Sequence, residues 1–133
     1  MKIIDIEGIG PAYATKLAKA GVRTVEGLLK EGATAKGRKE IAEASKVDQT
    51  LILGWVNRAD LYRVKGIGAQ YSDLLEKAGV DTVVELSKRV AGNLYKKMVE
   101  VNQAKNLVNG MPGQKKVEDW IEQAKKLPRV VTY

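Results

Sequence analysis

A short motif that occurs twice constrains the fold of this chain more than any other feature. Ile6–Gly10 reads Ile-Glu-Gly-Ile-Gly, and Val64–Gly68 reads Val-Lys-Gly-Ile-Gly. When the sequence is shifted by 58 residues, Ile3–Lys30 aligns with Leu61–Lys88, and 13 of the 28 aligned positions are identical. Identity at that density indicates an internal duplication, so each half is expected to form the same supersecondary unit.

The two copies differ in length. Trp55-Val56 correspond to Trp120-Ile121, but these pairs are 65 residues apart and not 58. The second copy therefore carries extra residues, which we place in a loop insertion near 109–113. The expected domains are residues 1–60 and 61–133, joined through a helix at about 50–62.

Glycine, proline and threonine divide each copy into short helices. Pro11 is suited to open a helix, Gly21 to end it, and Thr24 to cap the next one. A third helix is expected from about Arg38 to Ser45, after a connector at 32–37. In the second copy, Thr82-Val83-Val84-Glu85 has the spacing of a capping box, in which each side chain bonds the other residue's backbone amide.

Apolar residues recur at helical spacing through both copies, and the chain is predicted to be all-α. The expected core positions include Ala14, Leu17, Leu51, Ile52, Trp55, Val56, Ser72, Leu75, Ala78, Val117, Trp120, Ile121 and Ala124. Only the termini are β-prone, and Lys2–Ile6 and Arg129–Tyr133 are candidates for a strand pair.

Composition excludes several kinds of chemistry. The chain has no cysteine and no histidine, which rules out disulfides and removes the commonest zinc ligand and general base. Its carboxylates are scattered, so we expect no catalytic pair, no metal site and no enzyme. No apolar run approaches the ~20 residues that span a bilayer, and the N-terminus lacks a signal peptide, so the expected location is cytoplasmic. The net charge of +7 suits a polyanionic partner, but it equally keeps a small domain in solution.

The repeated Gly-Ile-Gly turn is suited to bind an anion. Glycines permit positive φ and let an oxygen approach the main chain, and the unpaired amides of the following helix carry partial positive charge. Neither nucleotide motif fits, however. A dinucleotide fingerprint needs a third glycine where Tyr13 and Tyr71 stand, and a phosphate-binding loop needs a Gly-Lys-Ser/Thr ending.

The residues around each turn resemble a known family. Gly8–Leu17 looks like the hairpin and second helix of the helix-hairpin-helix motif, and Gly66–Leu75 is similar, with Ser72 in place of an alanine. Ala20–Glu26 resembles a passage of the RNA polymerase alpha C-terminal domain and of the amino-terminal domain of archaeal recombinases. The whole chain is similar to an uncharacterised prokaryotic family with two such units. The resemblance implies two tandem helix-hairpin-helix (SAM-like) units packed as one compact helical protein.

The same resemblance implies sequence-independent binding of duplex DNA, with no small-molecule substrate and no membrane. In that family, hairpin amides contact backbone phosphates, nearby basic residues add charge, and hairpin carbonyls sometimes hold a monovalent cation. No other cofactor is implied. The residues that carry this role over to the second hairpin are Arg63, Lys65, Gly66, Ile67, Gly68 and Gln70.

The first hairpin is the weaker candidate. Its matching residues are Gly8, Ile9, Gly10 and Lys16, but Asp5 and Glu7 stand where the second hairpin has Arg63 and Lys65. Carboxylates at those positions repel phosphate. The charge count agrees, because residues 3–60 carry a net +1 and residues 61–127 a net +4.

Several of these features also have a purely structural interpretation. The basic pairs at 88–89, 96–97, 115–116 and 125–126 are best explained as solvated helix faces. The two tryptophans are expected in the core, and Tyr13 and Tyr71 are expected to pack beside the turns and not on a phosphate. The alternative function is a protein–protein interaction or structural adaptor in which the hairpins are purely structural.

Overall fold

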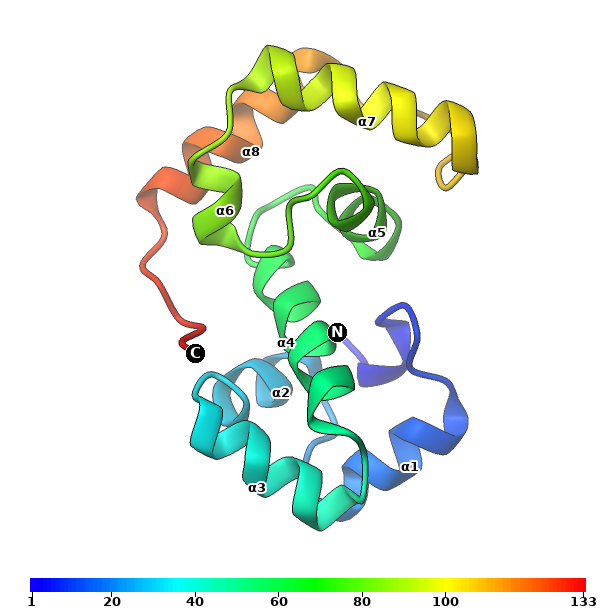
Figure 1. Ribbon diagram of the computed structural model, residues 1–133, viewed down its shortest axis with the longest axis vertical. Helices are drawn as coiled ribbons and strands as arrows, with labels where there is room; N and C mark the ends of the chain where they lie inside the picture. The colour runs from blue at the N-terminus through cyan, green and yellow to red at the C-terminus, as the bar shows by residue number, and fades with distance from the viewer. The chain divides into compact units, whose positions relative to one another are not determined.

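The computed structural model describes residues 1–133 and confirms an all-helical chain (Figure 1). Its elements are η1 (Ile3–Asp5), α1 (Pro11–Lys19), α2 (Val25–Glu31), α3 (Ala35–Ser45), α4 (Gln49–Leu61), α5 (Ala69–Lys77), α6 (Val83–Ser87), α7 (Ala91–Lys105) and α8 (Gln114–Lys126). None of these helices has the length and apolar character that crossing a membrane requires.

The chain divides into two compact units. The first comprises Met1–Asp60 together with Val130–Tyr133, and the second comprises Leu61–Arg129. The division falls in the last turn of α4. The last four residues thus group with the first unit, although the sequence placed them in the second.

In the first unit, α3 packs against both α1 and α2. Its core contains Ile6, Ile9, Leu17, Val22, Leu28, Ile41, Ile52, Trp55 and Val56. Helix α3 begins at Ala35, three residues earlier than expected, because the Thr34 hydroxyl caps it by accepting a hydrogen bond from the Gly37 amide at 3.0 Å. Gly37 therefore lies inside the first turn of α3 and not in a connector. A Cβ at this position would lie 2.0 Å from the backbone oxygen of Glu31, so only glycine allows α2 and α3 to approach this closely.

The expected strand pair between the termini is wrong. Ile3–Asp5 forms a turn of 3-10 helix, and Lys2 instead makes an isolated antiparallel bridge with Thr24. The C-terminal segment lies beside a different partner, because the Thr132 amide donates to the Ala33 carbonyl at 2.8 Å. Each terminus thus finds its backbone partner in a loop that flanks α2, which satisfies its amides without a sheet.

The N-terminus of α2 carries a carboxyl with a lowered pKa, that of Glu26. The pKa of the Glu26 carboxyl is lowered by a hydrogen bond from its own backbone amide and by one from the N-terminal amino group. Glu26 lies in the first turn of α2, where negative charge is favoured.

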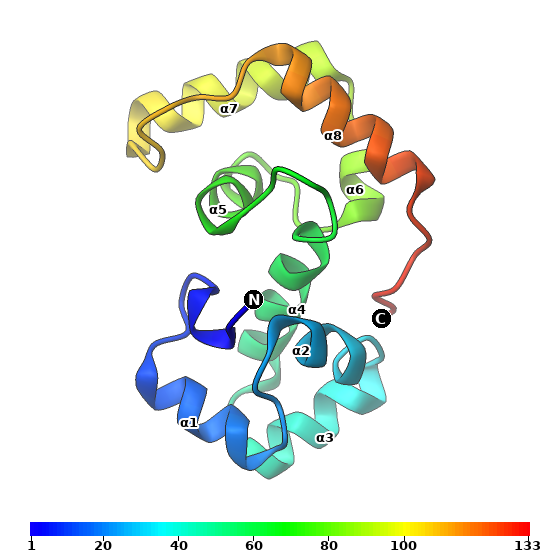
Figure 2. The ribbon, with the colours of Figure 1, turned by 180° about the vertical axis from the view of Figure 1, so that it is seen from behind.

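In the second unit, α8 packs against α6 and α7, and α7 also contacts α5. Figures 1 and 2 both show α7 and α8 side by side, joined by the loop at 106–113. The buried residues of this unit include Leu61, Val64, Ile67, Leu74, Leu75, Leu86, Leu94, Met98, Val117, Trp120 and Ile121. Asn102 holds the loop, because its side chain accepts from the Val108 amide at 2.9 Å and donates to the Val108 carbonyl at 3.1 Å.

Two local expectations need correction. Leu51 is 41% exposed, so the buried face of α4 begins at Ile52. The capping box at α6 is half formed: the Thr82 hydroxyl accepts from the Glu85 amide at 3.2 Å, but the Glu85 carboxylate pairs with Arg89, also at 3.2 Å. A guanidinium one turn away thus replaces the Thr82 amide as the partner of that carboxylate.

Candidate nucleic-acid interface

The two copies of the Gly-Ile-Gly motif fold into the same turn. The first glycine of each has a positive φ, +94° at Gly8 and +98° at Gly66. Each turn is closed by the amide of the central isoleucine, which donates to the carbonyl three residues before it, at 3.0 Å for Ile9 and 3.2 Å for Ile67. Both isoleucine side chains are buried. Ile67 therefore anchors the second turn to the core and presents no side chain to a ligand.

A tryptophan lies under each turn. The Cβ that any other residue would add at Gly66 would fall 2.9 Å from Nε1 of Trp120, and at Gly8 it would fall 3.3 Å from Nε1 of Trp55. Both indoles are buried, as the sequence predicted. Each also contacts a tyrosine from the following helix, at 5.1 Å between ring centroids in the first unit and 5.3 Å in the second.

The tyrosines are half-buried and pack beside the turns, as the sequence favoured. The Tyr71 hydroxyl donates to the Gly110 carbonyl at 3.1 Å, so it holds the 106–113 loop against α5. This bond was not visible in the sequence, because the inserted loop has no counterpart in the first copy.

The second glycine of each motif is the N-cap of the next helix and has an extended backbone, with φ of −89° at Gly10 and −108° at Gly68. A Cβ would meet nothing within 4 Å at either position. The backbone is therefore open to solvent at these two points. This openness lets an anion approach the first amides of the helix.

The helix starts differ in the donors they expose. No hydrogen bond within the protein uses the amides of Gly68, the N-cap of α5, or of Ala69 and Gln70, its first two residues. In α1 the position of Ala69 is occupied by Pro11, which has no N–H. The second unit therefore leaves one more unused amide at its helix start than the first.

A clamp that the sequence did not reveal holds the second turn. The Gln123 side chain on α8 accepts from the Lys65 amide at 2.8 Å and donates to the Lys65 carbonyl at 3.2 Å. The Lys65 amide is consequently not available to a ligand. The residue 65 positions earlier, which the tryptophan alignment pairs with Gln123, is Arg58, so the repeat gave no signal for this clamp.

The predicted side chains of the second turn separate into two groups. Lys65 and Gln70 are exposed, and their side chains have no partner within the protein. Arg63 is half-buried, and its guanidinium donates to the Pro128 carbonyl at 2.7 Å. Part of its hydrogen-bonding capacity is therefore used within the protein. Lys65 is therefore the main free cation at this turn.

At the first turn the free charges have the opposite sign. Asp5 and Glu7 are exposed and form no ion pair. The nearest predicted base, Lys16, lies over the Tyr13 ring, with Nζ 5.8 Å from its centroid. The turn geometry is thus shared by the two units, but the charge around it is not.

The basic pairs are exposed, with one exception. Arg89 is half-buried and donates to the Gly79 carbonyl at 2.8 Å in addition to its pair with Glu85. Lys125 pairs with Glu122 at 3.2 Å. No group of three or more acidic side chains is arranged to hold a metal ion.

Two compact helical units, each built on the same glycine turn over a buried tryptophan, define a duplicated all-helical protein. The chain belongs to the DUF4332 family, whose model is described as a domain of unknown function and matches residues 7–127, including both Gly-Ile-Gly sequences. The chain has no significant match among curated proteins or among solved structures.

Proposed function

We propose that this protein binds duplex DNA without sequence preference, through the turn at Val64–Gly68 and the first residues of α5. The observation that carries the proposal is the coincidence of three unused helix amides, an open Gly68 and an unpaired Lys65. The likeness of this turn to the helix-hairpin-helix motif supports the same ligand.

The interaction is one of position and charge. A backbone phosphate accepts hydrogen bonds from the amides of Gly68, Ala69 and Gln70, and the positive end of α5 favours its charge. The Lys65 ammonium adds a direct attraction to the same phosphate or to its neighbour. Because these groups reach the phosphates and not the base edges, affinity depends on salt and hardly on sequence.

The decisive experiment compares equivalent substitutions in the two turns. Gly68→Leu covers the open amides at a site where the backbone is extended and a side chain has room, and we expect duplex affinity in a low-salt mobility shift to fall at least about tenfold. Gly10→Leu makes the same change in the first unit and serves as the matched control, with unchanged affinity. Circular dichroism checks that both variants keep their helix content.

Charge reversal at the same two turns tests the electrostatic part. Lys65→Glu should weaken duplex binding, because it replaces a positive charge beside the second turn with a negative one. Glu7→Lys should strengthen duplex binding, because it makes the reverse change beside the first turn. If all four variants retain the duplex equally with their fold intact, the hairpin model is wrong.

A second candidate function is a protein-interaction adaptor, and one observation favours it. The first unit keeps the turn but surrounds it with the exposed carboxylates of Asp5 and Glu7 and replaces an amide donor with Pro11. A surface of this kind suits a basic partner better than a nucleic acid. Failure to bind any duplex or single strand at about 50 mM salt, together with a stable dimer in solution, would support this function.

A further inference from the structure

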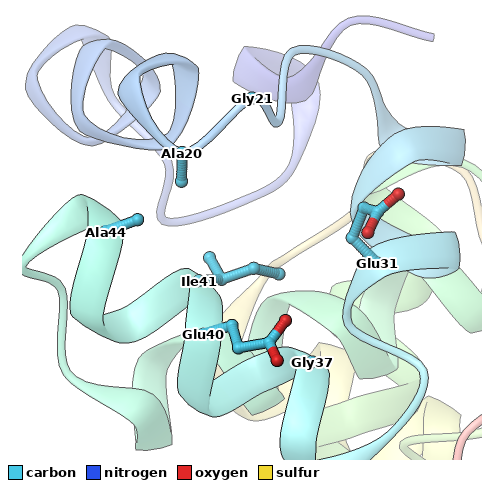
Figure 3. Close-up of a pocket in the computed structure, with 7 residues that line it drawn as sticks. All are labelled: Ala20, Gly21, Glu31, Gly37, Glu40, Ile41 and Ala44. Carbon is cyan, nitrogen blue, oxygen red and sulfur yellow. The ribbon is translucent and has the colours of Figure 1, made fainter.

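A pocket of about 370 Å³ lies within the first unit, where the C-terminal end of α1 faces α2 and α3 (Figure 3). Its lining residues are Ala20, Gly21, Glu31, Gly37, Glu40, Ile41 and Ala44. In Figure 3, Ala20 and Ala44 point toward Ile41, and the Glu40 side chain extends toward Glu31. The pocket thus combines an apolar wall with two carboxylates.

The charged groups of this pocket have no partner within the protein. Glu31 and Glu40 are exposed and form no ion pair or side-chain hydrogen bond. The carbonyl of Gly21, just beyond the end of α1, also accepts no hydrogen bond. Helix C-termini carry partial negative charge, and both α1 and α2 end at this pocket. All of these groups favour a cation.

The second unit shows what fills the corresponding place. At the same spacing of 58 residues, Gly21 corresponds to Gly79 and Glu31 to Arg89. The Arg89 guanidinium donates to the Gly79 carbonyl at 2.8 Å and lies 3.1 Å from where a Cβ on that glycine would be. At Gly21 a Cβ would meet nothing within 4 Å. One copy of the repeat therefore holds a guanidinium on this carbonyl, and the other leaves the space open.

We propose that the pocket of the first unit binds an arginine side chain supplied by a partner protein. The guanidinium donates to the Gly21 carbonyl, as Arg89 does to Gly79, and its remaining N–H groups pair with the carboxylates of Glu31 and Glu40. The methylene groups of the arginine pack on Ile41 and Ala44. This inference concerns a surface separate from the proposed DNA site and does not depend on it.

The experiment uses the full chain labelled with ¹⁵N and two small probes. N-acetyl-arginine methylamide should produce saturable amide shifts at Gly21, Gly37 and Ile41, with a dissociation constant of about 1 mM for a ligand of this size. The citrulline analogue has nearly the same shape without the charge and should bind at least about tenfold more weakly. The lysine analogue should also bind more weakly, because an ammonium lacks the planar fork.

Three variants locate the binding. Glu31→Gln combined with Glu40→Gln should weaken arginine binding at least about tenfold, since both charge-assisted bonds are lost. Glu43→Gln removes an exposed carboxylate of α3 that does not line the pocket, and it should leave the affinity unchanged. Glu31→Arg should fill the pocket from within, shift the Gly21 amide without any probe and abolish binding.

The absence of saturable shifts, equal binding of arginine and citrulline or of arginine and lysine, or undiminished affinity of the doubly substituted variant would each overturn the proposal. Urea midpoints of the variants establish that a loss of binding is not a loss of fold.

Discussion

At the scale of single residues, the two glycines of each turn have different roles. The first glycine has a positive φ, and at Gly66 a side chain would also collide with Trp120. The second glycine has an extended backbone with open space around it. The sequence presents the two as equivalent parts of one motif. Only the backbone angles reveal that the first shapes the turn and the second leaves it accessible.

This difference predicts unequal losses of stability for two alanine substitutions. Gly66→Ala should lower the free energy of unfolding by about 1–2 kcal/mol for the left-handed backbone alone, and by more because Trp120 must shift. Gly68→Ala should change it by no more than about 0.5 kcal/mol. Urea denaturation measures both values. Equal losses at the two positions would contradict the assignment of roles.

At the scale of elements, one buried arginine ties the C-terminal segment to the first unit. Arg38 on α3 is 3% exposed and donates to the carbonyls of Gly32, Ala33 and Thr132 at 2.9, 3.1 and 2.7 Å. Its guanidinium also lies 5.8 Å from the centroid of the Tyr133 ring. The guanidinium fork thus joins the residues that follow α2 to Thr132, which lies 94 residues beyond Arg38 in the chain.

Removal of this fork should destabilise the first unit. Arg38→Met removes three buried or part-buried hydrogen bonds, although the Ala33 carbonyl keeps the Thr132 amide as a donor, and we expect a loss of about 2–4 kcal/mol in the free energy of unfolding. Hydrogen exchange at the Thr132 amide should accelerate at the same time. Lys39→Met, at the exposed neighbouring position, is the control and should stay within about 0.5 kcal/mol. If hydrogen exchange at the Thr132 amide stays slow in Arg38→Met, Arg38 does not hold the C-terminal segment in place.

Most elements could be predicted from the sequence, because apolar spacing and cap residues are local signals. The buried faces of α5 and α8 follow from positions such as Leu75 and Trp120. What could not be predicted depends on residues far apart in the chain. Gln123 reaches the Lys65 backbone across 58 residues, and Thr132 reaches Ala33 across 99. No periodic pattern encodes such contacts, so the hydrogen-bond partners of the turn and of the termini appeared only in the structure.

The candidate site was predictable to a similar degree. The glycines, Lys65 and Gln70 could be named from the motif, since turn geometry and formal charge are properties of the sequence. The reduced role of Arg63 and the occupied amide of Lys65 could not, because each results from one side-chain contact that forms on folding.

At the scale of the whole molecule, the charge distribution sets the expected response to salt. The net charge is +7, but few of the cations lie at the proposed site, and acids are interleaved with bases throughout. The slope of log K against log salt therefore counts the phosphates that the site itself neutralises. This slope is negative, and Lys65→Gln should reduce its magnitude by about 0.9. The affinities for duplexes of unrelated sequence should fall by the same factor. A slope unchanged by this substitution would place the contacted phosphates elsewhere on the protein.

The indole under each turn has a consequence for how the protein can be observed. Because Trp55 and Trp120 are its only tryptophans, and Nε1 of each lies within 3.3 Å of where a turn-glycine Cβ would be, each unit carries its own intrinsic fluorophore. With Trp55→Phe the remaining tryptophan emission comes from the second turn alone, and with Trp120→Phe it comes from the first. A change in the surroundings of either turn can thus be followed by tryptophan emission in the unlabelled chain, one copy of the repeat at a time.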